Sequence, residues 1–332
     1  MELLFADWLG TPAWFWLAFA GLVLVLTAFD LGFLHKEDRE MGIAESLKLS
    51  VFYIAIAVAF GGWVWWSKGS ADGIDWYTGY FLEKALSIDN VFVISMIFGF
   101  FAIAPKYQYR ALLWGIVAVI VLRGLMIAGG VALVSQAHWV MYLFAAFLVF
   151  TGVKMLFSGD HEPDIAHNRA VRWISRHMRV TKAHHGHHFF VREPNDAGRM
   201  VWAATPLFLA LVVINLADLV FAVDSVPAIF SITTDTFIVY TSNIMAILGL
   251  RALYFALAAM VHRFHYLKYA LAMVLVFIGG KILVAELLLD GAKVPPLLGL
   301  GVTLGLIGGG VGWSLWKTRG QGAEAGPKTG RV

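Results

Sequence analysis

Long apolar stretches alternate with short polar ones along this chain of 332 residues. Each apolar stretch is about 20 residues long, the length that an α-helix needs to cross the hydrocarbon core of a bilayer. The pattern predicts an all-α polytopic membrane protein with roughly nine transmembrane helices. Their predicted ranges are 14–34, 48–66, 77–101, 111–134, 138–157, 202–231, 236–261, 267–289 and 296–316.

The amino-acid composition also indicates lipid as the main solvent. Apolar residues make up 60% of the chain and charged residues only 14%, whereas a soluble domain has about 25% charged residues. The 33 glycines suit membrane helices that pack closely. The chain has no cysteine, which excludes disulfides, thiolate metal sites and thiol redox chemistry.

Positive charges are distributed unevenly between the two sets of alternate loops. One set holds nearly all the loop Lys and Arg residues, and the opposite set holds Lys68 and Lys293. Loops rich in Lys and Arg stay in the cytoplasm. We therefore predict that the N-terminus lies outside and the C-terminus in the cytoplasm.

Two parts of the chain share a series of motifs. The third predicted helix contains LEKALSIDNVFVIS and the sixth contains LADLVFAVDSVPAIFS. An arginine follows each motif, and then come VFTGVKML in the fifth helix and VFIGGKIL in the eighth. Each unit has three helices, an odd number, so the second unit would enter the membrane from the opposite side. We therefore predict two inverted three-helix repeats, an architecture common in secondary transporters.

The repeat divides the chain into six parts. These are two N-terminal transmembrane helices (1–76), repeat unit 1 (77–157), a cytoplasmic loop rich in His and Arg (158–201), repeat unit 2 (202–289), a ninth transmembrane helix (290–317) and a disordered cytoplasmic tail (318–332).

Charged and polar side chains inside the predicted helices are the candidate site. A charge at a helix centre costs about 2.5–3.5 kcal/mol on insertion, so pairing or function must offset it. Carboxylate, amide and hydroxyl oxygens are ligands of hard divalent cations. The predicted metal ligands are Glu83, Asp89, Asn90, Asp218, Asp224 and Ser225, with Asp30, Asn215 and Asn243 as further candidates.

The alternative is that the carboxylates form structural ion pairs with basic residues in the same helices. Those basic residues, as counter-charges or structural partners, are Arg123, Lys154, Arg251 and Lys281. Pro227 follows Asp224 closely and lacks a backbone N–H, so a break in the sixth helix is also conceivable there.

The loop at 158–201 contains a histidine cluster at His184, His185, His187 and His188. Neutral imidazoles bind transition metals, so this cluster could deliver or sense a metal ion. A solvated basic loop is the interpretation that we favour.

The motifs EKALSIDNVFVISMIF and NLADLVFAVDSVPAIFSI closely resemble those of the TerC family, and within it the Alx-type proteins. The resemblance extends from the first predicted helix to the ninth. It implies a bacterial inner-membrane protein linked to tellurium resistance and similar to manganese(II) exporters. The family's acidic motif positions correspond here to Glu83, Asp89, Asp218 and Asp224, with Asn90 and Ser225 beside them.

These observations predict a secondary transporter that exports Mn²⁺ by alternating access. Carboxylates can exchange protons for metal ions, so coupling to protons fits the same residues. The chain contains no P-loop, no HExxH motif and no serine–histidine constellation in its helices, so we expect neither an ATP-driven pump nor an enzyme.

The sequence leaves two points open, the identity of the cation and the class of function. The metal ion is the expected cargo, membrane lipids are the expected partners, and we predict no prosthetic group and no nucleic acid. Oxygen ligands also admit Ca²⁺, Mg²⁺ and Fe²⁺. A different class of function is a non-transporting membrane anchor of a metal-stress or tellurium-resistance complex, which would act through the 158–201 loop.

Overall fold

The computed structural model describes residues 5–33, 42–136, 139–157, 179–181, 185–194, 199–258, 267–288 and 296–318. At a few helical positions within these ranges, the backbone alone is described; among them are Asp89, Asp224 and Arg251. Most of the predicted 158–201 loop and nearly all of the predicted disordered tail lie outside the described residues.

The described part of the chain is mostly helical, and each predicted range overlaps one long helix. These helices are α2 (Ala13–Phe33), α3 (Ile43–Lys68), α4 (Ser70–Phe100), α5 (Pro105–Gln136), α6 (Val140–Phe157), α8 (Pro206–Phe230), α9 (Thr236–Ala258), α10 (Leu267–Leu288) and α11 (Pro296–Lys317).

Not every helix is apolar enough to be assigned as a membrane span by itself. Within the described residues, six helices are long and apolar enough to cross a bilayer, or seven if the two arms of α9, which bend by 52°, form one span. Helix α4 is not among the six; it carries the LEKALSIDN motif and further carboxylates in its first turns. The number of nine spans therefore remains a prediction.

Three predicted helices start too late by several residues. Helices α3, α4 and α5 begin earlier than the apolar stretches do, because a helix can continue into water where hydropathy gives no signal. Pro105 is the first residue of α5. Proline is suited to this position because the N–H that it lacks would have no acceptor within the helix. Between α3 and α4, Gly69 adopts φ 104°, which favours glycine and turns the chain. Pro227 does not break α8, which continues to Phe230.

The structure also contains two antiparallel hairpins that hydropathy did not predict. Strands β1 (Asp7–Trp8) and β2 (Thr11–Pro12) precede α2, and strands β3 (Phe190–Pro194) and β4 (Met200–Ala204) precede α8. The predicted helix start at 202 is therefore wrong. Thr205 ends the hairpin and caps the helix, since its side chain accepts a hydrogen bond from the Phe208 N–H.

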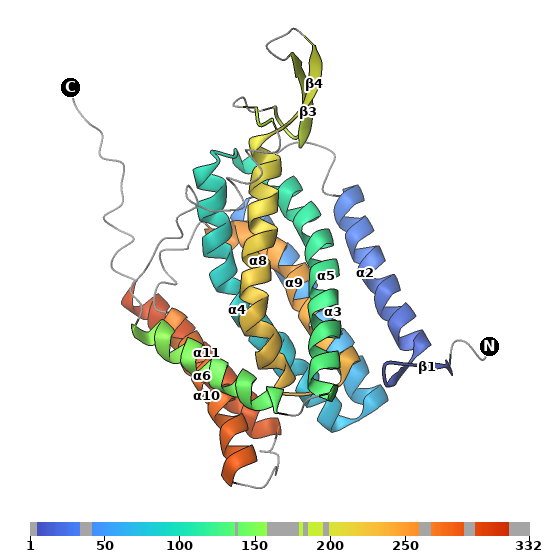
Figure 1. Ribbon diagram of the computed structural model, residues 1–332, viewed down its shortest axis with the longest axis vertical. Coiled ribbons are helices and arrows are strands. Elements are labelled where there is room, and N and C mark those ends of the chain that lie inside the picture. Colours follow the sequence, from blue (N-terminus) through green and yellow to red (C-terminus); the bar gives the residue numbers. More distant parts are fainter. Residues whose placement is uncertain are drawn as a thin grey trace.

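The helices form two groups (Figure 1). Helices α6, α10 and α11 lie together at the lower left, beside the group that contains α3, α4, α5, α8 and α9. Extensive contacts join α4 to α9, α5 to α8, and α6 to α10. The first helix of each predicted unit thus packs on the second helix of the other, and the third helices pack on each other. Such pairing is what two units related by a two-fold axis would give, although the inversion itself remains a prediction.

The backbones of α6 and α10 approach each other closely at two glycines. A Cβ atom on Gly152 would lie 2.7 Å from the carbonyl oxygen of Ala272. A Cβ atom on Gly279 would lie 2.6 Å from the carbonyl oxygen of Ala145. The two glycines occupy matching positions in VFTGVKML and VFIGGKIL, so each motif makes room for the other helix.

Candidate functional site

The guanidinium group of Arg123 lies at the centre of the candidate site. Arg123 is on α5, and its side chain is only 1% exposed. Its Nη1 lies 2.6 Å from Oε1 of Glu83 on α4. Its Nε and Nη2 donate to the two carboxylate oxygens of Asp218 on α8, at 3.2 and 3.1 Å. Two carboxylates from different helices therefore share one buried cation.

Neutral polar groups complete the surroundings of the guanidinium. Nη1 of Arg123 also lies 3.0 Å from the hydroxyl of Ser225 and 3.0 Å from the amide oxygen of Asn243. The amide nitrogen of Asn243 donates to Oε2 of Glu83 at 3.0 Å. Both oxygens of Glu83 are thus hydrogen-bonded, and we refer to these five residues as the Arg123 cluster.

Helical periodicity explains why α8 contributes two members of the cluster. Ser225 follows Asp218 by seven residues, close to two helical turns, so both lie on one face of α8. The same spacing places Glu83 and Asn90 on one face of α4. Asn243 belongs to α9, which packs against α4. Four helices therefore meet at the cluster.

Charge in the cluster is not balanced, because one guanidinium faces two carboxylates. A buried carboxylate without a partner is strongly unfavourable, and breaking a buried ion pair typically costs about 3–5 kcal/mol. Asp218 is the more accessible carboxylate, with its side chain 13% exposed against 3% for Glu83. Asp218 is therefore at the edge of the cluster and Glu83 is inside it.

A small cavity of about 40 Å³ adjoins the cluster on the side of the α4–α5 turn. Asp218 and Asn90 line it together with mainly apolar residues of α4, α5, α8 and α9, and it extends to Tyr254. Asn90 itself is buried. The space beside Asp218 therefore joins two of the predicted ligands.

The structure brings only some of the predicted ligands together. Glu83, Asp218, Ser225 and Asn243 meet at Arg123, whereas the side chains of Asp89 and Asp224 lie outside the described residues. The amide nitrogen of Asn215 donates to the Leu211 carbonyl of its own helix at 2.7 Å. Asp30 is buried near the end of α2.

The other predicted counter-charges do not share the position of Arg123. Lys154 is exposed on α6. Lys281 is half-buried on α10, close to Gly299 of α11. The side chain of Arg251 is outside the described part. Of the basic residues whose side chains are described, Arg123 is the one that the structure places between the two motif carboxylates.

Among the described side chains, no three His, Asp or Glu residues lie close enough together to hold a metal ion. The guanidinium of Arg123 occupies the position between the carboxylates of Glu83 and Asp218. A divalent ion at this position would need Arg123 to move, or a third carboxylate to approach. Glu83, Asp218, Ser225 and Asn243 would each offer it an oxygen atom, the ligand type that hard cations prefer.

One of the described histidines, His185, binds a carboxylate of the β3–β4 hairpin. Nε2 of His185 lies 2.8 Å from Oε1 of Glu193, and the hydroxyl of Thr181 donates to the same oxygen at 2.8 Å. The hydrogen bond from Thr181 lowers the pKa of Glu193. The rings of His187 and His188 contact each other at 4.4 Å between centroids. His184 lies outside the described residues, and neither the favoured interpretation as a solvated basic loop nor the alternative of a metal-binding cluster is tested.

Sequence reasoning underestimated Asn243, which was only a further candidate. An amide in the apolar stretch TSNIMAILGL was the available signal, because a buried amide must find hydrogen-bonding partners. The motif repeat gave no reason to single it out, since Asn243 has no matching residue in the quoted motifs.

Comparison with known proteins gives a consistent assignment. A model of the integral membrane protein TerC family matches residues 68–321. An uncharacterized membrane protein of Myxococcus xanthus is 42% identical over 310 residues, covering 93% of this chain and 94% of that protein. Alx of Escherichia coli K12, by its name a candidate membrane-bound redox modulator, is 41% identical over 307 residues, covering 90% and 92%. No solved structure matches significantly. The chain therefore belongs to the TerC family of integral membrane proteins.

Proposed function

We propose that this protein is a secondary transporter, and not an enzyme, that exports divalent metal cations across the bacterial inner membrane by alternating access. Its preferred cargo in this proposal is Mn²⁺. The observation that carries the proposal is the pair of carboxylates at matching motif positions, Glu83 and Asp218, held against one buried guanidinium. Oxygen ligands from both units beside a small cavity are suited to a hard cation.

In this mechanism Arg123 is an internal counter-charge. When no metal ion is bound, its guanidinium neutralises much of the charge on Glu83 and Asp218. A divalent cation that enters beside Asp218 competes with the guanidinium and displaces it. When the ion leaves, Arg123 returns, so the carboxylates are never buried without a partner. Protons that bind the same carboxylates provide the coupling.

The depth of the cluster agrees with a transport site. Arg123 lies well inside α5 and Asp218 lies near the middle of α8, and both helices are candidate membrane spans. Transporters built from inverted repeats bind their cargo near the middle of the membrane, between the repeats. The pairing of α4 with α9 and of α5 with α8 supports such an arrangement of two units.

The name of the Alx relatives fits this proposal without thiol chemistry. They are described by name as candidate membrane-bound redox modulators. This chain has no cysteine with which to exchange thiols or disulfides. Movement of a redox-active metal ion would affect the redox state of a cell by another route, and Mn²⁺ is such an ion.

The test is metal flux in proteoliposomes that contain the purified protein. We expect saturable Mn²⁺ flux in the parent protein, reduced by Ca²⁺, Mg²⁺ or Fe²⁺ only at higher concentrations. Glu83→Gln and Asp218→Asn remove one charge each with little change in shape, and flux should fall at least about tenfold in both. Asp89→Asn and Asp224→Asn test the other two motif carboxylates in the same assay.

A matched control is Thr78→Val, which removes another buried polar group from α4. Its hydroxyl donates to the carbonyl of Ile74 in the same helix, so flux should remain close to that of the parent. Normal flux in both Glu83→Gln and Asp218→Asn would refute the site. A parent protein that moves no divalent cation, with or without a proton gradient, would refute the transporter and favour the membrane anchor.

A further inference from the structure

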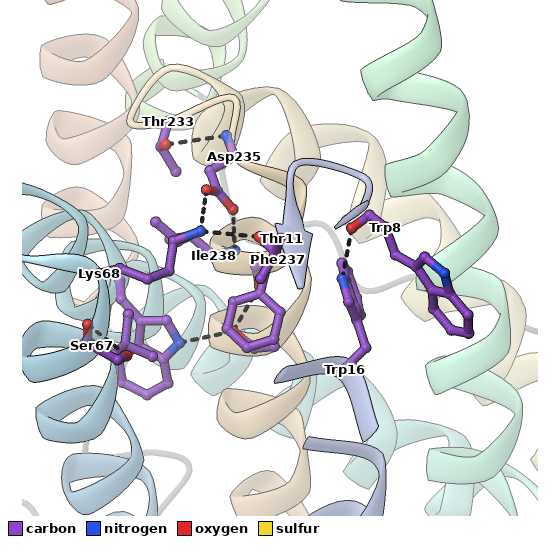
Figure 2. A network of polar contacts seen from close by, with 12 residues as sticks. Trp8, Thr11, Trp16, Ser67, Lys68, Thr233, Asp235, Phe237 and Ile238 are labelled. Carbon is purple, nitrogen blue, oxygen red and sulfur yellow. Dashed lines mark hydrogen bonds and ion pairs between the residues drawn. The ribbon is translucent and has the colours of Figure 1, made fainter. Parts of the chain in front are cut away.

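At the end of the bundle opposite the α4–α5 turn, Lys68 connects three separate segments (Figure 2). Its Nζ lies 2.7 Å from Oδ2 of Asp235, in the turn between α8 and α9, and donates to the hydroxyl of Thr11 on β2 at 3.0 Å. Lys68 itself ends α3. The side chains of Lys68 and Asp235 are 13% and 25% exposed, so this ion pair is partly shielded from solvent.

Asp235 is held in place by its own turn. Its Oδ1 accepts a hydrogen bond from the Ile238 N–H at 3.0 Å, which caps α9, and its backbone N–H donates to the hydroxyl of Thr233. One carboxylate oxygen therefore fixes the start of α9 and the other binds Lys68. A second carboxylate, Asp72, lies nearby in the first turn of α4. Its pKa is raised above the usual value, mainly by burial and also by the charge of Asp235, although the charge of Lys68 acts in the opposite direction.

Closely packed aromatic residues lie between this ion pair and the Arg123 cluster. Nζ of Lys68 is 5.7 Å from the ring centroid of Phe237, which contacts Phe15 and Trp16 edge-on. Deeper in the bundle, Trp76 stacks on Tyr80 and donates to the hydroxyl of Thr241.

Tyr80 lies about one turn before Glu83 on α4, and Thr241 lies two residues before Asn243 on α9. The rings of Phe237, Trp76 and Tyr80 are almost completely buried. Packed side chains thus separate Glu83 from the surface near Lys68.

The opposite side of the Arg123 cluster is less tightly packed. The cavity beside Asp218 and Asn90 extends from the cluster toward Tyr254 and Leu112, which lie nearer the α4–α5 turn. The conformation is therefore asymmetric, with space on that side of the cluster and dense packing on the side of Lys68.

We propose that the Lys68–Asp235 ion pair, together with Thr11, is a latch that closes the path from the Arg123 cluster to the face of the membrane at which α3 ends. In transport, this latch opens by separation of α3 and the β1–β2 hairpin from the α8–α9 turn, and the cation leaves there. The inference rests on the proposed transport function for its purpose, but the latch itself can be tested without any flux.

Because the chain has no cysteine, a single introduced cysteine reports accessibility in an otherwise unchanged protein. Ser242 on α9 is completely buried and lies beside Gly79 of α4, between the latch and Glu83. Ser242→Cys is nearly isosteric. The measurement is the rate at which this cysteine reacts with a membrane-impermeant maleimide in sealed vesicles. The vesicles must expose to the reagent the face at which α3 ends. A Ser70→Cys protein verifies this orientation by reacting rapidly, because Ser70 is exposed at that face.

Asp235→Asn keeps a capping side chain for α9 but removes the charge that binds Lys68. We expect it to accelerate labelling of Ser242→Cys by about tenfold, because loss of the ion pair increases the population of the open state. Lys68→Met should also accelerate labelling. Lys68→Arg keeps the positive charge, so the labelling rate should stay close to that of the parent. Ser67→Ala is the matched control, since the Ser67 hydroxyl bonds within α3, to the carbonyls of Trp63 and Val64.

The two proposals fail separately in this design. Unchanged labelling in both Asp235→Asn and Lys68→Met would refute the latch whether or not the protein transports metal. Thermal melting curves verify that all the variants are folded. Faster labelling in these variants, together with no divalent-cation flux in the parent, would support the latch and refute the transporter. If Lys68→Met fails to fold, Asp235→Asn alone decides, because it preserves the cap.

Discussion

Replacing Arg123 by glutamine is expected to destabilise the folded protein by about 3–5 kcal/mol, the usual effect of breaking a buried ion pair by removing one partner. The reason is that Glu83 and Asp218 would face each other without the guanidinium that binds both. The measurement is thermal unfolding of the purified protein in detergent. Arg123→Lys keeps the positive charge but not the forked set of N–H donors, so it should reduce the stability less than Arg123→Gln does.

Added Mn²⁺ makes this prediction specific to the proposed mechanism. A ligand that binds only the folded protein raises its stability. In Arg123→Gln the cation no longer competes with the guanidinium, so Mn²⁺ should raise the melting temperature of this variant more than that of the parent. Unfolding of Arg123→Gln at the parent temperature would contradict the structural role of Arg123. A variant that is destabilised but insensitive to Mn²⁺ would contradict its role as a counter-charge for the metal.

Replacing Gly279 by alanine is expected to destabilise the protein by about 1–3 kcal/mol, the range for overpacking a close contact. The new methyl group would lie 2.6 Å from the backbone carbonyl oxygen of Ala145, which cannot move without displacing α6. Gly152→Ala should have a similar effect from the other side, since its methyl group would meet the Ala272 carbonyl at 2.7 Å. Both are measured by thermal unfolding in the same detergent.

The neighbouring residue Gly280 provides a matched control. A Cβ atom at Gly280 would meet nothing within 4 Å, and in a helix alanine is favoured over glycine by about 0.5–1 kcal/mol. Gly280→Ala should therefore be neutral or slightly stabilising. Equal behaviour of Gly279→Ala and Gly280→Ala would show that the α6–α10 contact is less close than the structure has it.

The positions of the helices were largely predictable from the sequence, because lipid imposes a local requirement. In a bilayer every backbone N–H and C=O must be satisfied within its own helix, so a long apolar stretch has few alternatives. The predictions were wrong where this requirement does not act. Helices α3, α4 and α5 extend beyond their apolar stretches. Residues 200–204 pair with 190–194 as a hairpin, which depends on a partner strand that hydropathy does not consider.

For the candidate site, the motif repeat identified Glu83 and Asp218 as related residues, but the sequence did not show what lies between them. Two interpretations were open, a metal site and a set of structural ion pairs. The structure favours neither exclusively, since Arg123 binds both carboxylates and a cavity adjoins Asp218. Our proposal combines the two, with the ion pair as the state that precedes metal binding.

The sequence by itself determined the class of protein, the location of its long helices and the carboxylates on which the functional proposal rests. Composition, hydropathy and motif spacing are local properties, and each acts within one helix or between adjacent residues. Only the tertiary structure decided which polar groups meet. Arg123 is 40 residues from Glu83 and 95 from Asp218, and Lys68 is 167 residues from Asp235. Such contacts depend on which faces of distant helices pack together, and that is a property of the whole bundle.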